Sequence, residues 1–543
     1  MRFPNLRLGC LRTEMSTIRW LDILVIIAYM ATLMGVGLRF SRRQTSTERY
    51  FVAQRNIPGW AMGLSLLATL ISSVTFIAYP GSSYAGDWSN LVPGLTVIPV
   101  LFITVFVVIP FFREVVGMSA YEYFGKRFGY GARVYSSIAY SIGHLSKMGF
   151  VFYLLALTVN SVTGWNMDHL IILVGVLTIC YTLLGGVEAV IWADVIQGMV
   201  LWAGILVSLG FLLFLPPGGP AAMFHVAFSS HKISLGDMRL DLTKPTFLVL
   251  SLYGWFYYLQ RYTSDQTVIQ RYLVARSDRQ AVRGVLIGSL LCVPVWALFM
   301  LIGTLCWAFY KVTGELLPVA RSDQAFPYFI TTHLPPGLAG LFLAALFGAA
   351  MANLSSDLNS LAAVGVADYY HILFQRSTER AQLVVAKIIV ALCGGLCILI
   401  ASILGHSKGN ALSLWFTVSA IVSGGLVGLF LLAFLSTRAS KTGAYVGIAG
   451  SFVFTAWAVL TADGGRILNL GPYNFPMHNY MIGAIGQVLV FGFGYLASLV
   501  FPDGDTSRRE MTVWGWLSRR SAAKERHRVT TLPAVMVAYE SSH

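Results

Sequence analysis

The sequence predicts an all-α integral membrane protein. Of its 543 residues, 56% are hydrophobic and only 11% are charged, a composition unlike that of soluble globular domains. Apolar runs of about 20 residues, the length of a helix that crosses a bilayer, recur from one end of the chain to the other. The formal net charge of +14 comes from Lys and Arg residues that gather in the loops between these runs. This placement is typical of cytoplasmic loops and argues against a nucleic-acid surface.

The alternation of apolar runs and basic loops indicates about thirteen spans. The predicted spans cover residues 20–38, 59–81, 91–112, 133–160, 169–184, 189–215, 245–262, 281–310, 338–366, 381–404, 412–435, 444–460 and 480–500. The N-terminus is then predicted outside and the C-terminus in the cytoplasm, in the plasma membrane or, in a bacterium, the inner membrane. Because Arg2, Arg7 and Arg12 would lie on the side where few positive charges are expected, Met15 is predicted to be the translation start.

The span at residues 59–81 has an unusually polar middle. Small and hydroxylated residues occupy positions where a simple anchor carries Leu or Val: Ala68, Thr69, Ser72, Ser73 and Thr75. Such residues allow close helix packing, and they also allow a helix to open without leaving its polar groups unsatisfied. Both interpretations remain open from this stretch alone. The second predicts a broken helix whose freed oxygens hold an ion and a solute.

Two ionisable side chains lie deep within predicted spans. Asp194 follows the pair Gly185-Gly186, and Lys147 lies about 21 Å from the Arg133 end of its span at 1.5 Å per residue. A charge at this depth is unfavourable unless it meets a partner or a ligand. One interpretation pairs Lys147 with Asp194 as a structural contact. The other gives Asp194 a cation and Lys147 an anionic substrate.

Residues 348–360 place several oxygen-bearing side chains on one helix. Ala349, Ala352, Asn353 and Ser356 share a helical face, and Ser355 lies beside it. Oxygen ligands with small neighbours suit a hard monovalent cation, although helix packing through small and polar residues explains this pattern equally well.

Four ordered stretches of the chain resemble one protein family. They are residues 59–81, GGVEAVIWADVIQ (185–197), DQTVIQRYLVAR (265–276) and AAMANLSSDLNSLAAVGVADYY (349–370). In this order and spacing they resemble the sodium:solute symporter (sodium/glucose cotransporter) family, and the branch that moves sialic acid most of all. The resemblance extends from about residue 20 to residue 500.

The resemblance implies an all-α transporter with the LeuT-type fold. Two inverted five-helix repeats would cover residues 59–215 and 245–435. Residues 1–58 would contain a leading helix, and residues 216–244 an extracellular loop. Residues 436–501 would supply two additional helices, and residues 502–543 a basic cytoplasmic tail.

The resemblance also implies a shared sodium site between the first and eighth core helices. Backbone carbonyls of the first helix match Ala68 and Ile71. A carbonyl and two hydroxyls of the eighth match Ala349, Ala352 and Asn353. Both hydroxyl positions therefore differ in this chain, since Ala352 removes a ligand and Asn353 offers an amide oxygen. This departure puts the strength of the site and its ion in question.

A second sodium site, found in some members of the family, is matched fully by Asp194, Ser355 and Ser356. Lys147 resembles the Arg that meets the substrate carboxylate in the sialic-acid branch. Ser72 and Thr75 match substrate-contacting positions, whereas Leu70 replaces a polar residue. An organic anion is therefore expected as the solute, but not necessarily the same sugar acid.

We therefore expect a secondary active symporter and no enzyme. An inward flux of sodium would drive uptake of a small anionic solute, a sialic-acid-like sugar acid or another carboxylate, by alternating access. The alternatives are a sodium- or proton-coupled transporter of a neutral solute such as a sugar or polyol, and a transporter-like sensor. Asp194 is the residue that would titrate in a proton-coupled transporter. The short tail after residue 500 offers no output domain for a sensor.

Overall fold

The computed structural model describes residues 19–41, 46–319, 321–406, 425–465, 468–503 and 506–531. Within these ranges the chain is a bundle of helices, with a single isolated β-bridge between Ile57 and Ala275. The all-α class predicted from the sequence is therefore confirmed. Residues 1–18, which include Met15 and the three preceding arginines, lie outside the described residues, as do residues 532–543.

The elements fall into long helices, short helices and single turns. The long helices are α1 (Trp20–Ser41), α9 (Tyr130–Thr163), α10 (Met167–Phe214), α14 (Asp278–Thr313), α16 (Leu338–Val364), α18 (Glu379–Gly405), α21 (Lys441–Gly465), α22 (Tyr480–Val500) and α23 (Val513–Thr531). The shorter helices are α2 (Thr47–Val52), α3 (Gly59–Leu70), α4 (Tyr79–Ala85), α5 (Val92–Leu95), α6 (Val97–Ile103), α7 (Ile109–Val115), α8 (Tyr121–Phe128), α11 (Gly219–Ser229), α12 (Phe247–Thr263), α13 (Gln266–Val274), α15 (Ala325–His333), α17 (His371–Leu373) and α20 (Leu426–Leu435). Single turns are η1 (Ala53–Arg55), η2 (Val74–Ala78), η3 (Ser89–Leu91), η4 (Thr104–Val108), η5 (Ser322–Gln324), η6 (Gly365–Tyr370), η7 (Gly471–Tyr473) and η8 (Thr506–Met511).

The span at residues 59–81 is a broken helix, as the second interpretation of its sequence predicted. Helix α3 ends at Leu70, Ile71 is extended (φ −95°, ψ 120°), and the chain resumes through the π-helical turn η2 into α4. The two halves are bent by 59°. The hydroxyl of Ser72 accepts a hydrogen bond from the backbone N–H of Val74 at 3.3 Å. A hydroxylated side chain thus satisfies a backbone donor that the break leaves without a helical partner.

The two spans predicted at 169–184 and 189–215 form one helical run. Helix α10 has 48 residues, interrupted at Gly186, which adopts φ +58° and ψ −168°. This backbone conformation is accessible to glycine and strained for other residues. A run of this length measures about 72 Å, more than twice the ~30 Å of a bilayer core, so it provides two crossings joined at Gly186.

Nine helices among the described residues are long and apolar enough to cross a membrane, or ten when the bent pair α3–α4 counts as one span. The expected total of about thirteen stays a prediction. Residues 412–424 of one predicted span lie outside the described ranges, so that span is represented only by α20.

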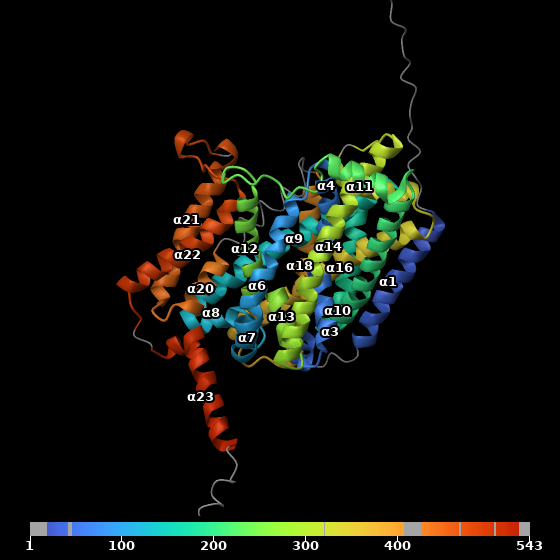
Figure 1. The fold of residues 1–543 in the computed structure, drawn as a ribbon. Coiled ribbons are helices and arrows are strands. Elements are labelled where there is room, and N and C mark those ends of the chain that lie inside the picture. The colour runs from blue at the N-terminus through green and yellow to red at the C-terminus, as the bar shows by residue number, and fades with distance from the viewer. Residues whose placement is uncertain are drawn as a thin grey trace, which may run out of the picture.

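Burial separates central helices from peripheral ones. The most apolar stretch of 18 residues in α16 and the turn that follows it is 89% buried. The corresponding stretches of α1 and α18 are each 22% buried. In Figure 1, α1 lies at one edge of the bundle, and α21 and α22 lie at the other. The polar side chains of α16 therefore face protein, where they can bind one another, an ion or a solute.

Candidate functional site

A small cavity lies at the break between α3 and η2. Its volume is about 60 Å³, and both Ser72 and Thr75 line it. The same cavity is lined by aromatic residues of α12 and α14, namely Tyr253, Tyr257, Tyr258 and Trp296. The structure thus brings two of the three predicted substrate residues to one cavity, whose lining combines hydroxyls with aromatic rings; Lys147 is not among the lining residues. Such a lining suits a small polar solute with an apolar face.

Lys147, the third predicted substrate residue, forms a salt bridge with a residue that was not expected. Its Nζ lies 2.5 Å from Oδ2 of Asp357 on α16, and both side chains are buried. The pairing of Lys147 with Asp194 considered from the sequence is therefore wrong, because Asp194 contacts a different cation. Lys147 nevertheless lies beside the break, since Val151, one turn further along α9, accepts a hydrogen bond from Ser73 at 3.1 Å.

The Lys147–Asp357 pair belongs to a larger buried network. His144 lies between two carboxylates, with Nδ1 2.9 Å from Oδ1 of Asp357 and Nε2 3.2 Å from Oδ2 of Asp265. Arg261 forms a salt bridge with the same oxygen of Asp265. Helices α9, α12 and α16 are thereby joined at the start of α13, and each buried charge has an opposite charge beside it, as burial requires.

Of the residues predicted for the shared sodium site, Asn353 on α16 contacts the end of α3. Nδ2 of Asn353 donates to the backbone carbonyl of Thr69 at 2.6 Å, so the side chain reaches the C-terminal end of α3. Oδ1 of Asn353 is buried and has no hydrogen-bond partner among the described residues. The other predicted positions, Ala68, Ile71, Ala349 and Ala352, are all buried. A buried amide oxygen that lacks a donor is a suitable ligand for a cation.

Asp194, the acidic residue of the second predicted sodium site, is completely buried and has two partners. Ser65 Oγ donates to its Oδ2 at 2.6 Å, and Nη2 of Arg271 lies 3.3 Å from the same oxygen. Its other oxygen, Oδ1, has no hydrogen-bond partner in the part of the chain that the structure describes. Half of the carboxylate thus remains without a donor at a depth where an isolated charge is unfavourable.

The two predicted serine ligands differ in their surroundings. The hydroxyl of Ser356 accepts a hydrogen bond from Nη2 of Arg271 and lies 3.2 Å from Oγ1 of Thr69. The hydroxyl of Ser355 donates to the carbonyl of Ala352 at 3.2 Å. Arg271 therefore connects Asp194 to Ser356 and holds a fixed positive charge at the predicted ion site.

No group of three or more His, Cys, Asp or Glu residues suited to a metal ion occurs among the described residues. The oxygen atoms at the break come instead from hydroxyls, amides, carbonyls and single carboxylates. This donor set lacks the imidazole and thiolate ligands that most transition metals prefer, and it consists of the oxygen ligands that hard cations take.

Sequence reasoning missed several charged residues of this site: His144, Arg261, Asp265, Arg271 and Asp357. The rule that drew attention to Asp194, a charge within an apolar span, applies equally to Asp357. Arg271 and Asp265 lie in a stretch that was treated only as a family signature. Their roles depend on which helix faces meet, and local spacing does not contain that information.

Comparison with known proteins places these features in a family. The model of the sodium:solute symporter family matches residues 50–450. The sodium/sialic acid symporter NanT of Aliivibrio fischeri is 31% identical over 524 residues, which cover 95% of this chain and 99% of the relative. The sodium/sialic acid symporter SiaT of Proteus mirabilis is 32% identical over 488 residues, covering 89% and 95%.

Two solved structures support the architecture. A substrate-bound, outward-open Na⁺-coupled sialic acid symporter superposes with a TM-score of 0.81 and 31% identity, covering 89% of this chain and 99% of that chain. The nucleobase-cation-symport-1 transporter Mhp1 has a TM-score of 0.52 at 16% identity, covering 85% and 97%, and shows likeness of fold alone. The predicted LeuT-type fold class is confirmed by these neighbours.

Proposed function

Because this chain belongs to the sodium:solute symporter family and its transport is coupled to sodium, we propose that its solute is a sialic-acid-like sugar acid. The solute would enter the cavity at the break of α3, where Ser72 and Thr75 offer hydroxyls. At about 60 Å³ this cavity is smaller than the roughly 300 Å³ of a ligand pocket, so it must widen to admit a sugar acid. The buried ammonium of Lys147 would bind its carboxylate. Two relatives named as sodium/sialic acid symporters support this choice of solute.

The observation that carries the proposal is the position of Lys147. It is a cation beside the broken helix, and its partner Asp357 does not depend on it alone. Oδ1 of Asp357 also receives a hydrogen bond from Thr267 at 2.9 Å and contacts His144 at 2.9 Å. When Lys147 turns toward the solute, Asp357 therefore keeps two partners. The ammonium exchanges one carboxylate for another, and Asp357 loses its salt bridge but keeps the hydrogen bonds to its Oδ1.

We place one sodium ion between α3 and α16. The carbonyls of Ala68, Ile71 and Ala349 and Oδ1 of Asn353 would coordinate it. Asn353 replaces a hydroxyl here, and its Nδ2 already donates to the Thr69 carbonyl. An ion at this position would join the broken helix to α16 and favour one angle at the break.

We place a second ion at Asp194, Ser355 and Ser356. Arg271 already contacts Asp194 and Ser356, so this ion and the guanidinium would compete for the same oxygens. Ion binding here therefore requires Arg271 to withdraw from at least one of them. Since both sites share α16 with the network around Lys147, binding of sodium and binding of solute would strengthen each other by the same factor.

The protein is a multi-pass membrane protein, and we propose that its basic loops and tail lie in the cytoplasm. With this orientation an inward sodium gradient drives uptake, through opening of the central site to alternate sides of the membrane. Cysteine labelling at position 541 from the outer face of intact cells would contradict the orientation.

The test is uptake of N-acetylneuraminate by proteoliposomes that carry an imposed inward sodium gradient. The matched control solute is its methyl ester, which differs in the carboxylate charge. We expect uptake of the acid in sodium, little uptake in potassium, and little uptake of the ester in either. Equal uptake of acid and ester would favour the neutral-solute alternative. Uptake driven by a proton gradient without sodium would contradict sodium coupling.

A further inference from the structure

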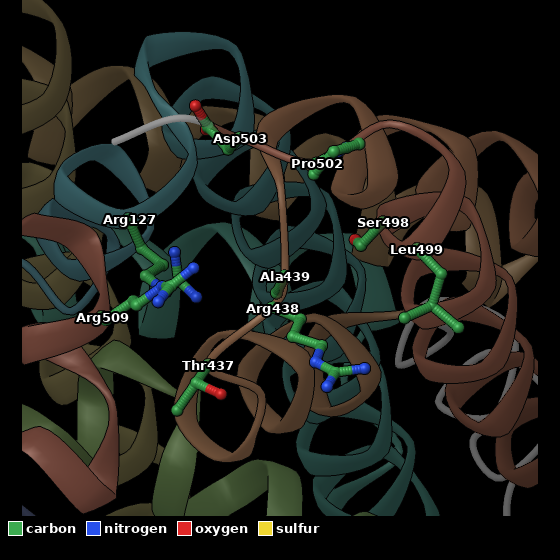
Figure 2. Close-up of a pocket in the computed structure, with 9 residues that line it drawn as sticks. All are labelled: Arg127, Thr437, Arg438, Ala439, Ser498, Leu499, Pro502, Asp503 and Arg509. Carbon is green, nitrogen blue, oxygen red and sulfur yellow. The ribbon is translucent and has the colours of Figure 1, made fainter. Parts of the chain in front are cut away.

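A second cavity, of about 240 Å³, lies where the ends of several helices meet the start of the tail (Figure 2). Three arginines from distant parts of the sequence line it: Arg127 of α8, Arg438 between α20 and α21, and Arg509 of η8. In Figure 2 the guanidinium groups of Arg127 and Arg509 overlap, and both residues line the cavity. Neither the symport mechanism nor the comparisons assign a role to this cavity.

Arg127 is held rigidly in this lining. Its side chain is only 1% exposed, its Nε donates to the carbonyl of Ala433 at 3.3 Å, and its Nη2 donates to that of Ser436 at 2.8 Å. These carbonyls lie at the C-terminal end of α20, where a positive charge is favourable. The guanidinium also lies 5.3 Å from the centre of the Phe128 ring. A buried cation is thus fixed in place before any ligand arrives.

Among the described residues that line the cavity, positive charges outnumber negative ones. Asp503 contributes a negative charge against the three arginines, and Arg438 and Arg509 are both exposed. Like charges repel at short range, and the repulsion is stronger near the low-dielectric membrane than in water. An anion with two or more oxygens would relieve it, and a phosphate group matches the forked geometry of guanidinium.

Helix α22 is long and apolar enough to span a membrane, and its apolar surface leads to this cavity. Leu496, Val500 and Phe501 are 60%, 70% and 56% exposed, and the next residue, Pro502, lines the cavity. Side chains so exposed on a membrane helix face acyl chains. A ligand that fits both surfaces is amphiphilic, with an anionic head and an apolar tail.

We propose that this cavity binds the phosphodiester headgroup of an anionic phospholipid, whose acyl chains lie along Leu496 and Val500 of α22. Basic pockets at the membrane surface bind such headgroups through their phosphates. The proposal is independent of the solute that the protein carries.

The bound lipid would also fasten the tail to the bundle. Arg509 belongs to η8, which leads into α23. This segment is already docked, because Nε1 of Trp516 donates to Glu114 at 2.8 Å and the hydroxyl of Tyr123 donates to the carbonyl of Met511 at 3.1 Å. The phosphate would add a link between Arg509 of the tail and Arg438 of the bundle.

The experiment is native mass spectrometry of the full-length protein, titrated with phosphatidylglycerol or with phosphatidylcholine of the same acyl chains. The variant is the double substitution Arg438→Gln/Arg509→Gln, which leaves Arg127 and its contacts with α20 intact. The matched control is Arg376→Gln, an exposed arginine of the loop between α17 and α18 that lies outside the cavity lining. Inorganic phosphate serves as the competing free anion.

We expect one phosphatidylglycerol to bind the wild type and the control more tightly than phosphatidylcholine does. The double variant should bind it about 30-fold more weakly, as expected for the loss of two arginine contacts of ~1 kcal/mol each. Equal retention of phosphatidylglycerol by the double variant and the control would overturn the proposal. So would displacement of the lipid by low millimolar phosphate, because the cavity would then be a site for the free anion.

Discussion

The Nζ atom of Lys147 lies 2.5 Å from Oδ2 of Asp357, and both side chains are buried in the helix bundle. This salt bridge connects α9 to α16 beside the break in α3. It gives Lys147 a partner within the protein, and it holds Lys147 one helical turn from Val151, which accepts a hydrogen bond from Ser73 at the break. The proposed function requires both the salt bridge and the position of Lys147 near the break.

The first prediction concerns folding. Removing one partner of a buried ion pair leaves an uncompensated charge and costs about 3–5 kcal/mol. We expect Lys147→Gln and Asp357→Asn each to lower the melting temperature of the purified protein, and the double variant to recover most of the loss. The control is Lys147→Gln combined with Asp194→Asn, which should show no recovery. Recovery with Asp194→Asn instead would contradict the observed pairing.

The second prediction concerns solute affinity. If Lys147 binds the carboxylate, the folded double variant Lys147→Gln/Asp357→Asn should still bind N-acetylneuraminate roughly 10- to 150-fold more weakly, since a charge-assisted contact is worth about 1.5–3 kcal/mol. Lys147→Arg should be impaired less, because the charge remains while its geometry changes. Tryptophan-fluorescence titration measures both. Wild-type affinity in the stable double variant would limit Lys147 to a structural role.

The third prediction concerns the second sodium site. Asp194→Asn removes the charged ligand, whereas Ser355→Ala and Ser356→Ala each remove one hydroxyl. We expect a higher half-saturating sodium concentration in all three, with the largest increase in Asp194→Asn, because loss of a charged ligand leaves the cation least compensated. Initial uptake rates over a sodium series provide the readout. Sodium activation that is unchanged in Asp194→Asn would remove this residue from the site.

The fourth prediction concerns Asn353 in the shared sodium site. Serine at this position retains an oxygen on the same helical face. Leucine fills the cavity with an apolar side chain and offers no oxygen. We expect Asn353→Ser to keep sodium-dependent uptake and Asn353→Leu to abolish it, with both variants compared at equal amounts of folded protein. If both variants transport at near-normal rates, Asn353 serves packing only.

The fifth prediction concerns the packing of the broken helix. Helix α14 approaches α3 so closely that a Cβ atom on Gly288 would lie 2.5 Å from the carbonyl oxygen of Gly63. We expect Gly288→Ala to push the helices apart and lower stability by about 1–3 kcal/mol. Gly395→Ala on α18 is the control, since a Cβ there meets nothing within 4 Å. Equal melting temperatures for the two variants would contradict this packing.

Local sequence pattern was sufficient for part of this molecule. The polar middle of residues 59–81 predicted the broken helix, because hydroxylated residues in a span are needed where backbone groups lose their helical partners. Likewise, the isolation of Asp194 in an apolar run predicted a site with an opposite charge nearby. In both cases the cost of leaving a polar or charged group unsatisfied within one membrane span was enough to predict the feature.

The partners of those charges could not be predicted from the sequence of a single segment. Lys147 meets Asp357, and Asp194 meets Arg271, across helices that are distant in the sequence. Which faces of two helices come together depends on the packing of the whole bundle. The glycine contacts between α3 and α14 illustrate this, since glycine at each position is uninformative until the neighbouring backbone is known.

The most direct test of the central claim is calorimetric titration of the purified protein with N-acetylneuraminate, in sodium and in potassium at equal ionic strength. The account predicts binding in sodium, an affinity that rises with sodium concentration, and no measurable binding of the methyl ester. It also predicts the reciprocal effect, a higher sodium affinity when the acid is present. Acid affinity that is the same in sodium and in potassium would contradict the proposed coupling, and equal affinity for acid and ester would contradict recognition of the carboxylate.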